Sequence, residues 1–284
     1  MELTDLKVFV TVAEEGSVSR AAERLEYVQS NVTARIRKLE SEIGVALFFR
    51  HPKGVTLTDK GIVFREYALS ILNLSEESLR AVREKSYPSG PLSIGVVETV
   101  TCGNFMNALS AFQNRYPDVT LSLITGASSE LLSMVLANQL DGAFVTGGMA
   151  SSKLVSEYEM RDELVLLTTN QEEAYPDLSN TKWAVSPKGC PFRTVLEQWL
   201  HREGIAFDNM IEIGSLETLL SCVRAGLAST LLPTSVLTGD YQSLAAYPIP
   251  EKFRFTNTNL VRRKDRFYGK AFAAFAEMIN QSGL

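Results

Sequence analysis

Apolar residues recur at helical spacing three times within residues 1–43 of the chain. The three sets are Leu6, Phe9, Val10 and Ala13; Val18, Ala21, Ala22 and Leu25; and Val32, Ile36, Leu39 and Ile43. Steps of three and four residues place each set on one side of a helix, so the pattern predicts three short helices, each with one buried stripe. Thr4 and Ser17 stand at expected N-cap positions, and Gly16 and Gly44 stand where helices are expected to end.

The third predicted helix carries polar and basic side chains outside its apolar stripe. A short turn around Tyr27 separates it from the second helix, as in a helix-turn-helix. In recognition helices, the first residues meet base edges, whereas Arg and Lys neutralise phosphates. The residues on these faces are Gln29, Ser30, Asn31, Thr33, Arg35, Arg37 and Lys38. The alternative is that the basic residues only solvate an exposed helix face.

Residues 45–58 read as two short strands around a Pro-Lys-Gly turn. A hairpin beside a helix-turn-helix forms a wing, and Arg50 and Lys53 at this turn can reach the DNA backbone or the minor groove. His51 lies at the same turn, where a lone histidine is more often merely exposed to solvent.

From Thr58 to about Ser86 the chain lacks proline and favours one long helix. Steps of four and three residues relate Phe64, Ala68, Ile71, Ser75, Ser78 and Val82, with Leu72 and Leu79 alongside. This spacing suits packing against a partner helix and indicates a dimer. Two serines make the seam imperfect, so a helix packed within its own chain is the alternative.

Residues 87–91 form a breaker cluster that ends the long helix. Beyond it, strand-like segments (92–97, 120–125, 142–146, 163–168) alternate with helix-like segments (102–116, 130–138, 193–203, 216–225). Such alternation predicts α/β subdomains with parallel sheets. Ligands bind such sheets at the strand carboxyl ends, where this chain is rich in small and hydroxyl residues. These loops suit a polar or anionic small molecule, although plain helix capping would use the same residues.

The net charge of −5 conceals an uneven distribution. Residues 1–65 carry ten Lys and Arg against nine Asp and Glu, so the negative excess lies in the remainder. Within residues 27–57, five basic residues are opposed only by Glu40 and Glu42. A local basic surface, rather than the global charge, is what contact with phosphates requires.

Cysteine usage and hydropathy indicate a cytoplasmic protein. Cys102, Cys190 and Cys222 are widely spaced and form no CxxC pair, which fits a reducing compartment. With only His51 and His201 beside them, we expect no structural metal and no cofactor. The first residues lack the basic start and apolar stretch of a secretory signal. No apolar run approaches the ~20 residues of a membrane span, so no membrane partner is expected.

Four motifs in register over about sixty residues resemble the winged helix-turn-helix of LysR-type transcriptional regulators. They are AAERL (21–25), QSNVTARIRKLE (29–40), GVALFFR (44–50) and LTDKG (57–61). The resemblance implies base or nearby phosphate contacts for Gln29, Ser30 and Thr33, and supporting phosphate contacts for Arg35, Arg37, Lys38 and Arg50. Val28 departs from the Ser or Thr cap common in the family. Ala34 stands where many members have Arg, so Arg35, about 100° further around the helix, is expected to aim at a different phosphate.

The second half of the chain resembles the LysR-type effector domain, a two-lobed fold like the periplasmic solute-binding proteins. The motifs that carry the resemblance are residues 92–95, Phe112 with 116–119, 140–143, 163–166, 223–227 and 232–233. It implies a multi-domain α+β and α/β chain: a winged helix-turn-helix at 1–58, a linker and dimerisation helix with hinge at 59–90, and an effector-binding domain at 91–284. Within that domain, lobe one comprises 91–161 plus 263–284, and lobe two 162–262.

The resemblance also implies a ligand cleft between the lobes. The residues expected there are Thr99, Thr101, Ser128, Thr146 and Ser186. A homo-oligomer, dimer or tetramer, would bind an interrupted inverted repeat in double-stranded promoter DNA, with RNA polymerase as a further partner. A small-molecule effector in the cleft would change transcription.

Other readings of the second half remain open. A thiol-based redox sensor could use Cys190, whose pKa could be lowered by Lys188 and a following helix N-terminus, although a resolving cysteine nearby is missing. An enzyme using Cys190 or Ser186 with His201 lacks an acidic orienting group and any GxSxG or P-loop motif. A solute-binding protein without DNA function leaves residues 1–57 unexplained.

Overall fold

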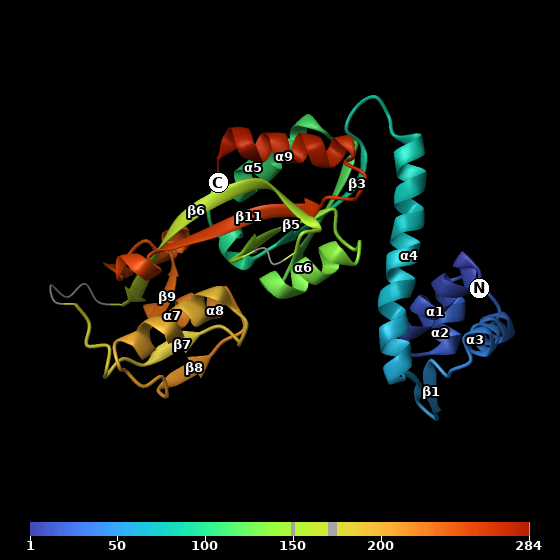
Figure 1. Cartoon of the computed structure of the whole chain (residues 1–284), viewed down its shortest axis with the longest axis horizontal. Coiled ribbons are helices and arrows are strands. Elements are labelled where there is room, and N and C mark those ends of the chain that lie inside the picture. The colour runs from blue at the N-terminus through green and yellow to red at the C-terminus, as the bar shows by residue number, and fades with distance from the viewer. Residues whose placement is uncertain (149–150, 170–174, 284) are drawn as a thin grey trace. The chain divides into compact units, whose positions relative to one another are not determined.

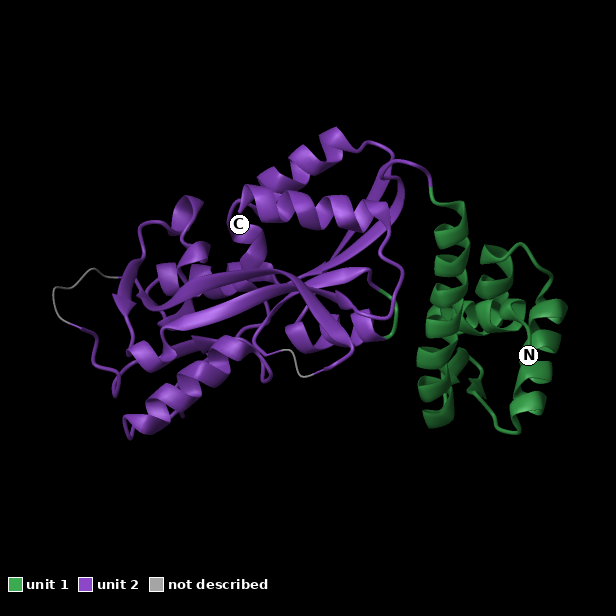
Figure 2. Ribbon diagram, turned by 45° about the horizontal axis from the view of Figure 1, so that its top comes forward, with its two compact units in different colours: residues 1–84, 137–139 green, residues 85–136, 140–284 purple. Residues whose placement is uncertain are grey.

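The computed structural model describes residues 1–148, 151–169 and 175–283. The chain divides into two compact units (Figure 2). The first contains residues 1–84 and 137–139, and the second contains residues 85–136 and 140–284.

The first unit is helical with one small hairpin (Figure 1). Its elements are α1 (Leu3–Glu15), α2 (Val18–Arg24), α3 (Gln29–Ile43), β1 (Phe48–His51), β2 (Gly54–Leu57) and α4 (Asp59–Arg83). Only residues 25–28 separate α2 from α3, and β1 pairs with β2 in antiparallel orientation. The predicted winged helix-turn-helix and the long helix after it are therefore confirmed.

Local signals end these helices largely as predicted. Gly16 and Gly44 adopt left-handed conformations with φ of 57° and 78° after α1 and α3. Ser17 caps α2 because its hydroxyl accepts the backbone N–H three residues later at 3.4 Å.

The N-cap predicted at Thr4 is wrong. The first helix already begins at Leu3, and Glu2 is its cap. The Asp5 carboxylate in the first turn accepts the Glu2 N–H at 3.0 Å, so the helix begins two residues earlier than it would with a cap at Thr4.

The N-terminal half of α4 belongs to the core of the first unit. The Phe9 ring lies 5.2 Å from the Phe48 ring and 5.0 Å from the Phe64 ring, and Ala68 is fully buried in the same cluster. The seam predicted for a partner helix is therefore wrong at Phe64 and Ala68, because spacing alone does not distinguish a partner from the same chain. The predicted seam residues Ile71, Leu79 and Val82 are exposed, and Ile71 and Val82 form an exposed stripe with Val63, Tyr67 and Leu74.

The described part of the second unit contains a seven-stranded mixed sheet and a two-stranded parallel sheet, with helices packed around them (Figure 1). Its strands are β3 (Gly90–Val96), β4 (Val119–Thr125), β5 (Gly142–Thr146), β6 (Leu154–Thr168), β7 (Trp183–Val185), β8 (Met210–Glu212), β9 (Thr230–Pro233), β10 (Ala245–Pro248) and β11 (Phe255–Arg263). Its α-helices are α5 (Phe105–Arg115), α6 (Ser128–Leu136), α7 (Pro191–Arg202), α8 (Leu216–Arg224) and α9 (Lys270–Ser282). Short 3-10 helices are η1 (Glu98–Cys102), η2 (Thr234–Val236), η3 (Gly239–Tyr241) and η4 (Glu251–Phe253).

The strand directions correct the expectation of parallel sheets. β3 is parallel to β4 and β5, and β7 is parallel to β8. β11, however, runs antiparallel to β5 and β6, and β9 and β10 run antiparallel to β6. β5 and β6 run in the same direction, and β11 lies between them and runs opposite to both, because it brings the chain back from lobe two to lobe one.

Two hydrophobic cores divide the second unit. Lobe one gathers around the buried rings of Phe112, Phe144 and Phe275, and lobe two around Trp183 and Trp199. The strand β6 contributes to both cores, with its first half packed against lobe one and its second half buried in lobe two. The predicted division at 161/162 falls inside β6, and the division at 262/263 falls inside β11.

Gly61 provides a test of how the wing is joined to α4. The Thr58 hydroxyl accepts the Gly61 N–H at 3.0 Å and donates to the Ala46 carbonyl at 2.9 Å. A Cβ at Gly61 would overlap the Leu47 carbonyl oxygen. We expect Gly61→Ala to lower the free energy of unfolding by about 3 kcal/mol, because backbone rather than a side chain must move.

Urea denaturation of the full chain measures this loss. The control is Gly103→Ala, where an added Cβ meets no atom within 4 Å, and its effect should stay within about 1 kcal/mol. Equal stability of the two variants would show that the wing junction tolerates displacement.

Candidate functional site

The start of α3 presents hydrogen-bonding side chains to solvent. Gln29, Ser30 and Arg37 are exposed, and Thr33 is half-buried. Val28 is the N-cap residue and has no side-chain oxygen for the first N–H groups of the helix. The positive end of α3 therefore lies beside exposed amide and hydroxyl groups, a combination suited to phosphates and base edges.

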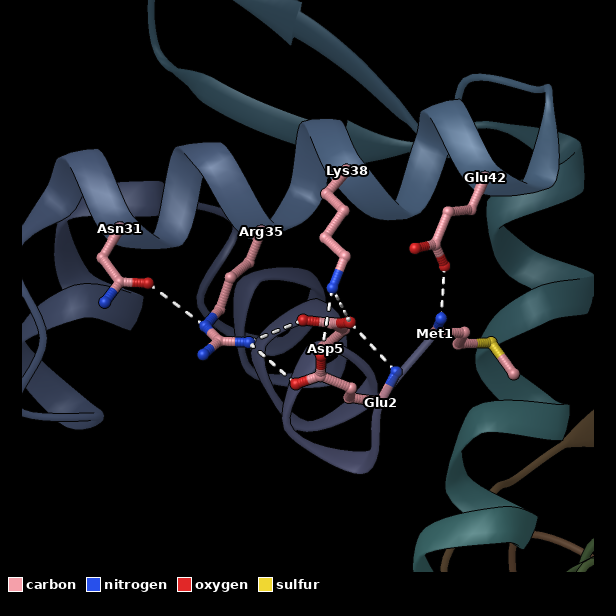
Figure 3. A network of polar contacts seen from close by, with 7 residues as sticks. All are labelled: Met1, Glu2, Asp5, Asn31, Arg35, Lys38 and Glu42. Carbon is pink, nitrogen blue, oxygen red and sulfur yellow. Dashed lines mark hydrogen bonds and ion pairs between the residues drawn. The ribbon is translucent and has the colours of Figure 1, made fainter.

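Arg35 and Lys38 point toward the beginning of α1 (Figure 3). Arg35 Nη1 donates to Asp5 Oδ1 at 2.7 Å, and Arg35 Nε donates to Asn31 Oδ1 at 3.1 Å. Lys38 Nζ donates to Glu2 Oε1 at 3.1 Å and lies 3.7 Å from Asp5 Oδ2. Two cations expected to contact phosphates are thus bound to carboxylates of their own chain, where they link α3 to α1.

Asp5 is the fully buried centre of this network. Burial raises the pKa of its carboxyl. The Glu2 N–H, Arg35 and Lys38 together lower this pKa by more than burial raises it, so the pKa lies below its ordinary value of 3.8. The role of Asp5 could not be predicted from the sequence, because it lies about thirty residues from its partners, beyond the range of helix spacing rules. An acidic residue beside the apolar stripe of α1 was the available signal.

Glu40 fastens the wing to α3. Its Oε1 accepts the backbone N–H groups of Leu47 and Phe48 at 2.9 and 3.2 Å, and its Oε2 lies 3.5 Å from Arg50 Nη2. Lys53 at the turn of the wing is exposed. Of the two basic wing residues, Arg50 is therefore held beside α3, whereas Lys53 faces solvent.

A cleft of about 400 Å³ lies between the two lobes of the second unit. Thr99, Ser128, Thr146 and Ser186, four of the five predicted effector residues, line it. Thr101 is not among the lining residues, since its hydroxyl donates to the Glu98 carbonyl at 2.6 Å within η1. The prediction for Thr101 therefore has no support in the geometry.

Hydrogen bonds within the protein orient the hydroxyl groups of the cleft. Ser128 Oγ accepts the Thr146 N–H at 3.0 Å, which leaves the Ser128 O–H hydrogen to donate to a ligand. The Thr146 and Thr258 hydroxyls lie 2.8 Å apart. Sequence analysis missed Thr258, because β11 was not among the predicted strands.

Arg193 fixes the opposite wall of the cleft. Its side chain is only 3% exposed and donates from Nη1 to the Ser186 carbonyl at 3.1 Å and to Glu212 at 2.6 Å. Its Nε donates to Glu197 at 2.8 Å. This role could not be predicted from the sequence, because the partners of Arg193 at Ser186 and Glu212 lie outside its own helix.

The charged groups in the cleft wall are Glu98, Glu130 and Lys188. Cys190 also lines the cleft, as a half-buried free thiol at the N-cap of α7. Cys102 and Cys222 are free as well, so nothing in the described structure favours a redox sensor.

No group of three or more His, Cys, Asp or Glu side chains suited to a metal ion occurs among the described residues. The described helices include none with the length and apolar character needed to cross a membrane.

The Asp5 network predicts a pH-dependent stability. We expect Asp5→Asn to lower the free energy of unfolding by about 1–3 kcal/mol at neutral pH, because the Arg35 guanidinium loses its charged partner. A pKa that is lowered in the folded state stabilises the fold above the unfolded-state value and loses this effect as the pH falls through the folded-state value.

The difference between the parent and Asp5→Asn should therefore shrink below about pH 4, as measured by urea denaturation between about pH 7 and pH 3. Glu23→Gln, at an exposed position on α2, is the control. A difference that does not depend on pH would refute the ionised network.

Comparison with known proteins gives two family matches in order along the chain. Residues 3–62 match the model described as bacterial regulatory helix-turn-helix protein, lysR family. Residues 85–283 match the LysR substrate binding domain.

Relatives match over nearly the whole chain. The HTH-type transcriptional regulator CzcR of Bacillus anthracis is 40% identical over 284 residues, which cover 99% of this chain and 98% of CzcR. The HTH-type transcriptional regulator GltR of Bacillus subtilis (strain 168) is 38% identical, covering 97% of this chain and 95% of GltR.

Solved structures show the same fold. A full-length variant of OxyR from Pseudomonas aeruginosa matches with a TM-score of 0.74 at 23% identity and covers 99% of this chain and 95% of its own. CbnR complexed with its target DNA matches with a TM-score of 0.72 at 24% identity and covers 99% of both chains. Both family models and full-length relatives thus show that the chain belongs to the LysR family and is a DNA-binding transcriptional regulator with an effector-binding domain.

Proposed function

We propose that this regulator binds an interrupted inverted repeat in promoter DNA as a homo-oligomer and alters transcription when a polar or anionic small molecule occupies the cleft. The observation that carries the proposal is the exposed start of α3, where Gln29 and Ser30 stand beside an N-terminus that Val28 leaves uncapped. The solved complex of CbnR with its target DNA supports this assignment of the helix-turn-helix.

The contacts within the first unit divide the basic residues into two groups. Arg37 and Lys53 are exposed and are proposed to neutralise phosphates, while Gln29, Ser30 and Thr33 read base edges. A second group of cations, Arg35, Lys38 and Arg50, is paired with carboxylates of the chain. We propose that these three position α3 and the wing, and that any phosphate contact by them requires exchange of a carboxylate partner.

The DNA interface can be tested by gel-shift titration against the chain's own upstream DNA and against unrelated DNA. Gln29→Ala should lower specific affinity by about tenfold and leave nonspecific affinity unchanged, because it removes a base contact. Arg37→Ala should lower both affinities and reduce the slope of log affinity against log salt by about one.

Arg115→Ala, which removes an exposed positive charge from α5 in the second unit, is the matched control and should change neither affinity. Equal losses in specific and nonspecific binding for both Gln29→Ala and Arg37→Ala would overturn the division of roles. No binding of the parent protein to any DNA at low salt would overturn the DNA-binding proposal itself.

The exposed stripe of α4 supports self-association. Val63, Tyr67, Leu74 and Val82 follow one another at helical spacing, and more than half of each side chain is exposed. A second copy of the same helix would bury this stripe and bring two recognition helices together, as a two-fold repeat in DNA requires.

Leu74→Glu should therefore weaken the oligomer, because it places a charge within the stripe. Sedimentation equilibrium should show a lower mass at micromolar concentration. Ile62→Glu changes an exposed apolar residue on another face of α4 and should leave the mass unchanged. An unchanged oligomer in Leu74→Glu would remove α4 as the dimer contact.

The effector site is proposed at the cleft because four hydroxyl residues from distant parts of the sequence line it. The relatives are transcriptional regulators, and we assign no catalytic reaction to Cys190 or Ser186. RNA polymerase as a partner and a cytoplasmic location complete the proposal, on the ground of the family alone.

A further inference from the structure

A carboxylate that follows the sheet of lobe one is bound to a helix of lobe two. Glu98 opens η1 directly after β3, and Leu216 opens α8. Glu98 Oε2 accepts the Leu216 N–H at 2.8 Å, although 118 positions separate the two residues in sequence. Both residues line the cleft, so this hydrogen bond crosses it.

The partner of Glu98 is a helix end that favours an anion. The first N–H groups of a helix have no acceptor within the helix, and the peptide dipoles place partial positive charge there. In α8, the Ser215 hydroxyl accepts the Thr218 N–H at 3.5 Å, and Glu98 satisfies the N–H of Leu216. The protein's own carboxylate therefore occupies the place that an anionic group in the cleft would take.

The rest of Glu98 is anchored independently of this contact. The Thr101 hydroxyl donates to the Glu98 carbonyl at 2.6 Å, and Cys102 Sγ lies 3.8 Å from the same oxygen. The Glu98 side chain is otherwise exposed. The carboxylate can therefore leave Leu216 by side-chain rotation while η1 keeps its structure.

We propose that Glu98 is a built-in competitor of the effector. Without a ligand, its carboxylate ties lobe one to lobe two at Leu216, and an anionic group of the effector replaces it there. The inference rests on the proposed function, in which the cleft is the effector site. In this proposal, a ligand can bind at Leu216 only when the hydrogen bond from Leu216 to Glu98 is broken. The ligand therefore shifts the equilibrium from lobes joined by this bond to lobes without it.

The hydrogen bond between Glu98 and Leu216, here called the tether, also determines which ligands can act as effectors. Among the described residues that line the cleft, the charged side chains are the anions Glu98 and Glu130 and the cation Lys188. An anion that enters must also displace the hydrogen bond between the Glu98 carboxylate and the Leu216 N–H. A small anion with one contact gains too little to do so. The effector class that fits is an organic anion with further polar groups for Ser128 and Thr146.

The test is calorimetric titration of the full-length protein with succinate and, separately, with inorganic phosphate at constant ionic strength. Glu98→Ala should bind at least one of them about tenfold more tightly than the parent, and Glu98→Gln should lie between the two. Glu130→Gln removes the same charge from the same cleft without touching α8 and should change affinity by less than about threefold. Unchanged or weaker binding in Glu98→Ala overturns the proposal.

Hydrogen exchange provides a second readout that needs no ligand. The amide of Leu216 should exchange more slowly in the parent than in Glu98→Ala, whereas that of Thr218, capped by Ser215, should change less. Equal exchange at Leu216 would show that the tether does not form in solution. All variants should retain DNA binding in gel shifts, so loss of the tether and failure of the proposed regulator function give different results.

Discussion

The second unit depends on the antiparallel pairing of two long strands, β6 and β11. Their register runs from Phe255 opposite Glu163 to Arg263 opposite Leu154, with one irregularity at Leu260/Val261. Because β6 enters both hydrophobic cores, neither lobe can be separated from the other without breaking this ladder. The cleft is the space that two cores on one pair of strands leave between them, and its walls therefore come from segments far apart in sequence.

Paired charges do similar work in both units. Asp5 holds Arg35 and Lys38 against α1, Glu40 holds the wing, and Arg193 holds the loop at Ser186. Hydrogen bonds to charged groups are directional, so these three side chains fix the position of their partners more narrowly than apolar packing would. In this regulator, charged side chains thus set the geometry of the α3 surface and of the cleft wall, while apolar residues supply the cores.

Much of the first unit could be predicted from the sequence because its signals are local. Helical spacing, Ser17, Gly16 and Gly44 act within a few residues, and the structure follows them. The ion pairs could not be predicted, since Asp5 and Arg35 are thirty residues apart and like many other surface charges in composition. The Glu98 contact with Leu216 could not be predicted for the same reason, since 118 positions separate the two residues.

The prediction of parallel strands in the second unit was wrong for a different reason. Alternating strands and helices predict parallel neighbours, but β11, which was not among the predicted strands, lies between β5 and β6 and runs opposite to both. The cleft residues Thr99, Ser128, Thr146 and Ser186 could still be predicted, because hydroxyl groups gather at strand ends whichever way the neighbouring strands run.

One helix, α4, serves two purposes with two stripes that lie about 100° apart around its axis. Phe64 and Ala68 pack α4 into the core of the first unit, which carries α3, while Tyr67 and Leu74 are exposed. The number of residues between the two stripes therefore fixes the angle between them around the axis of α4, since each residue adds about 100°. A single residue inserted between Ala68 and Leu74 would turn Leu74 and Val82 by about 100° relative to Val63 and Tyr67, and would thereby divide the stripe between two faces of the helix.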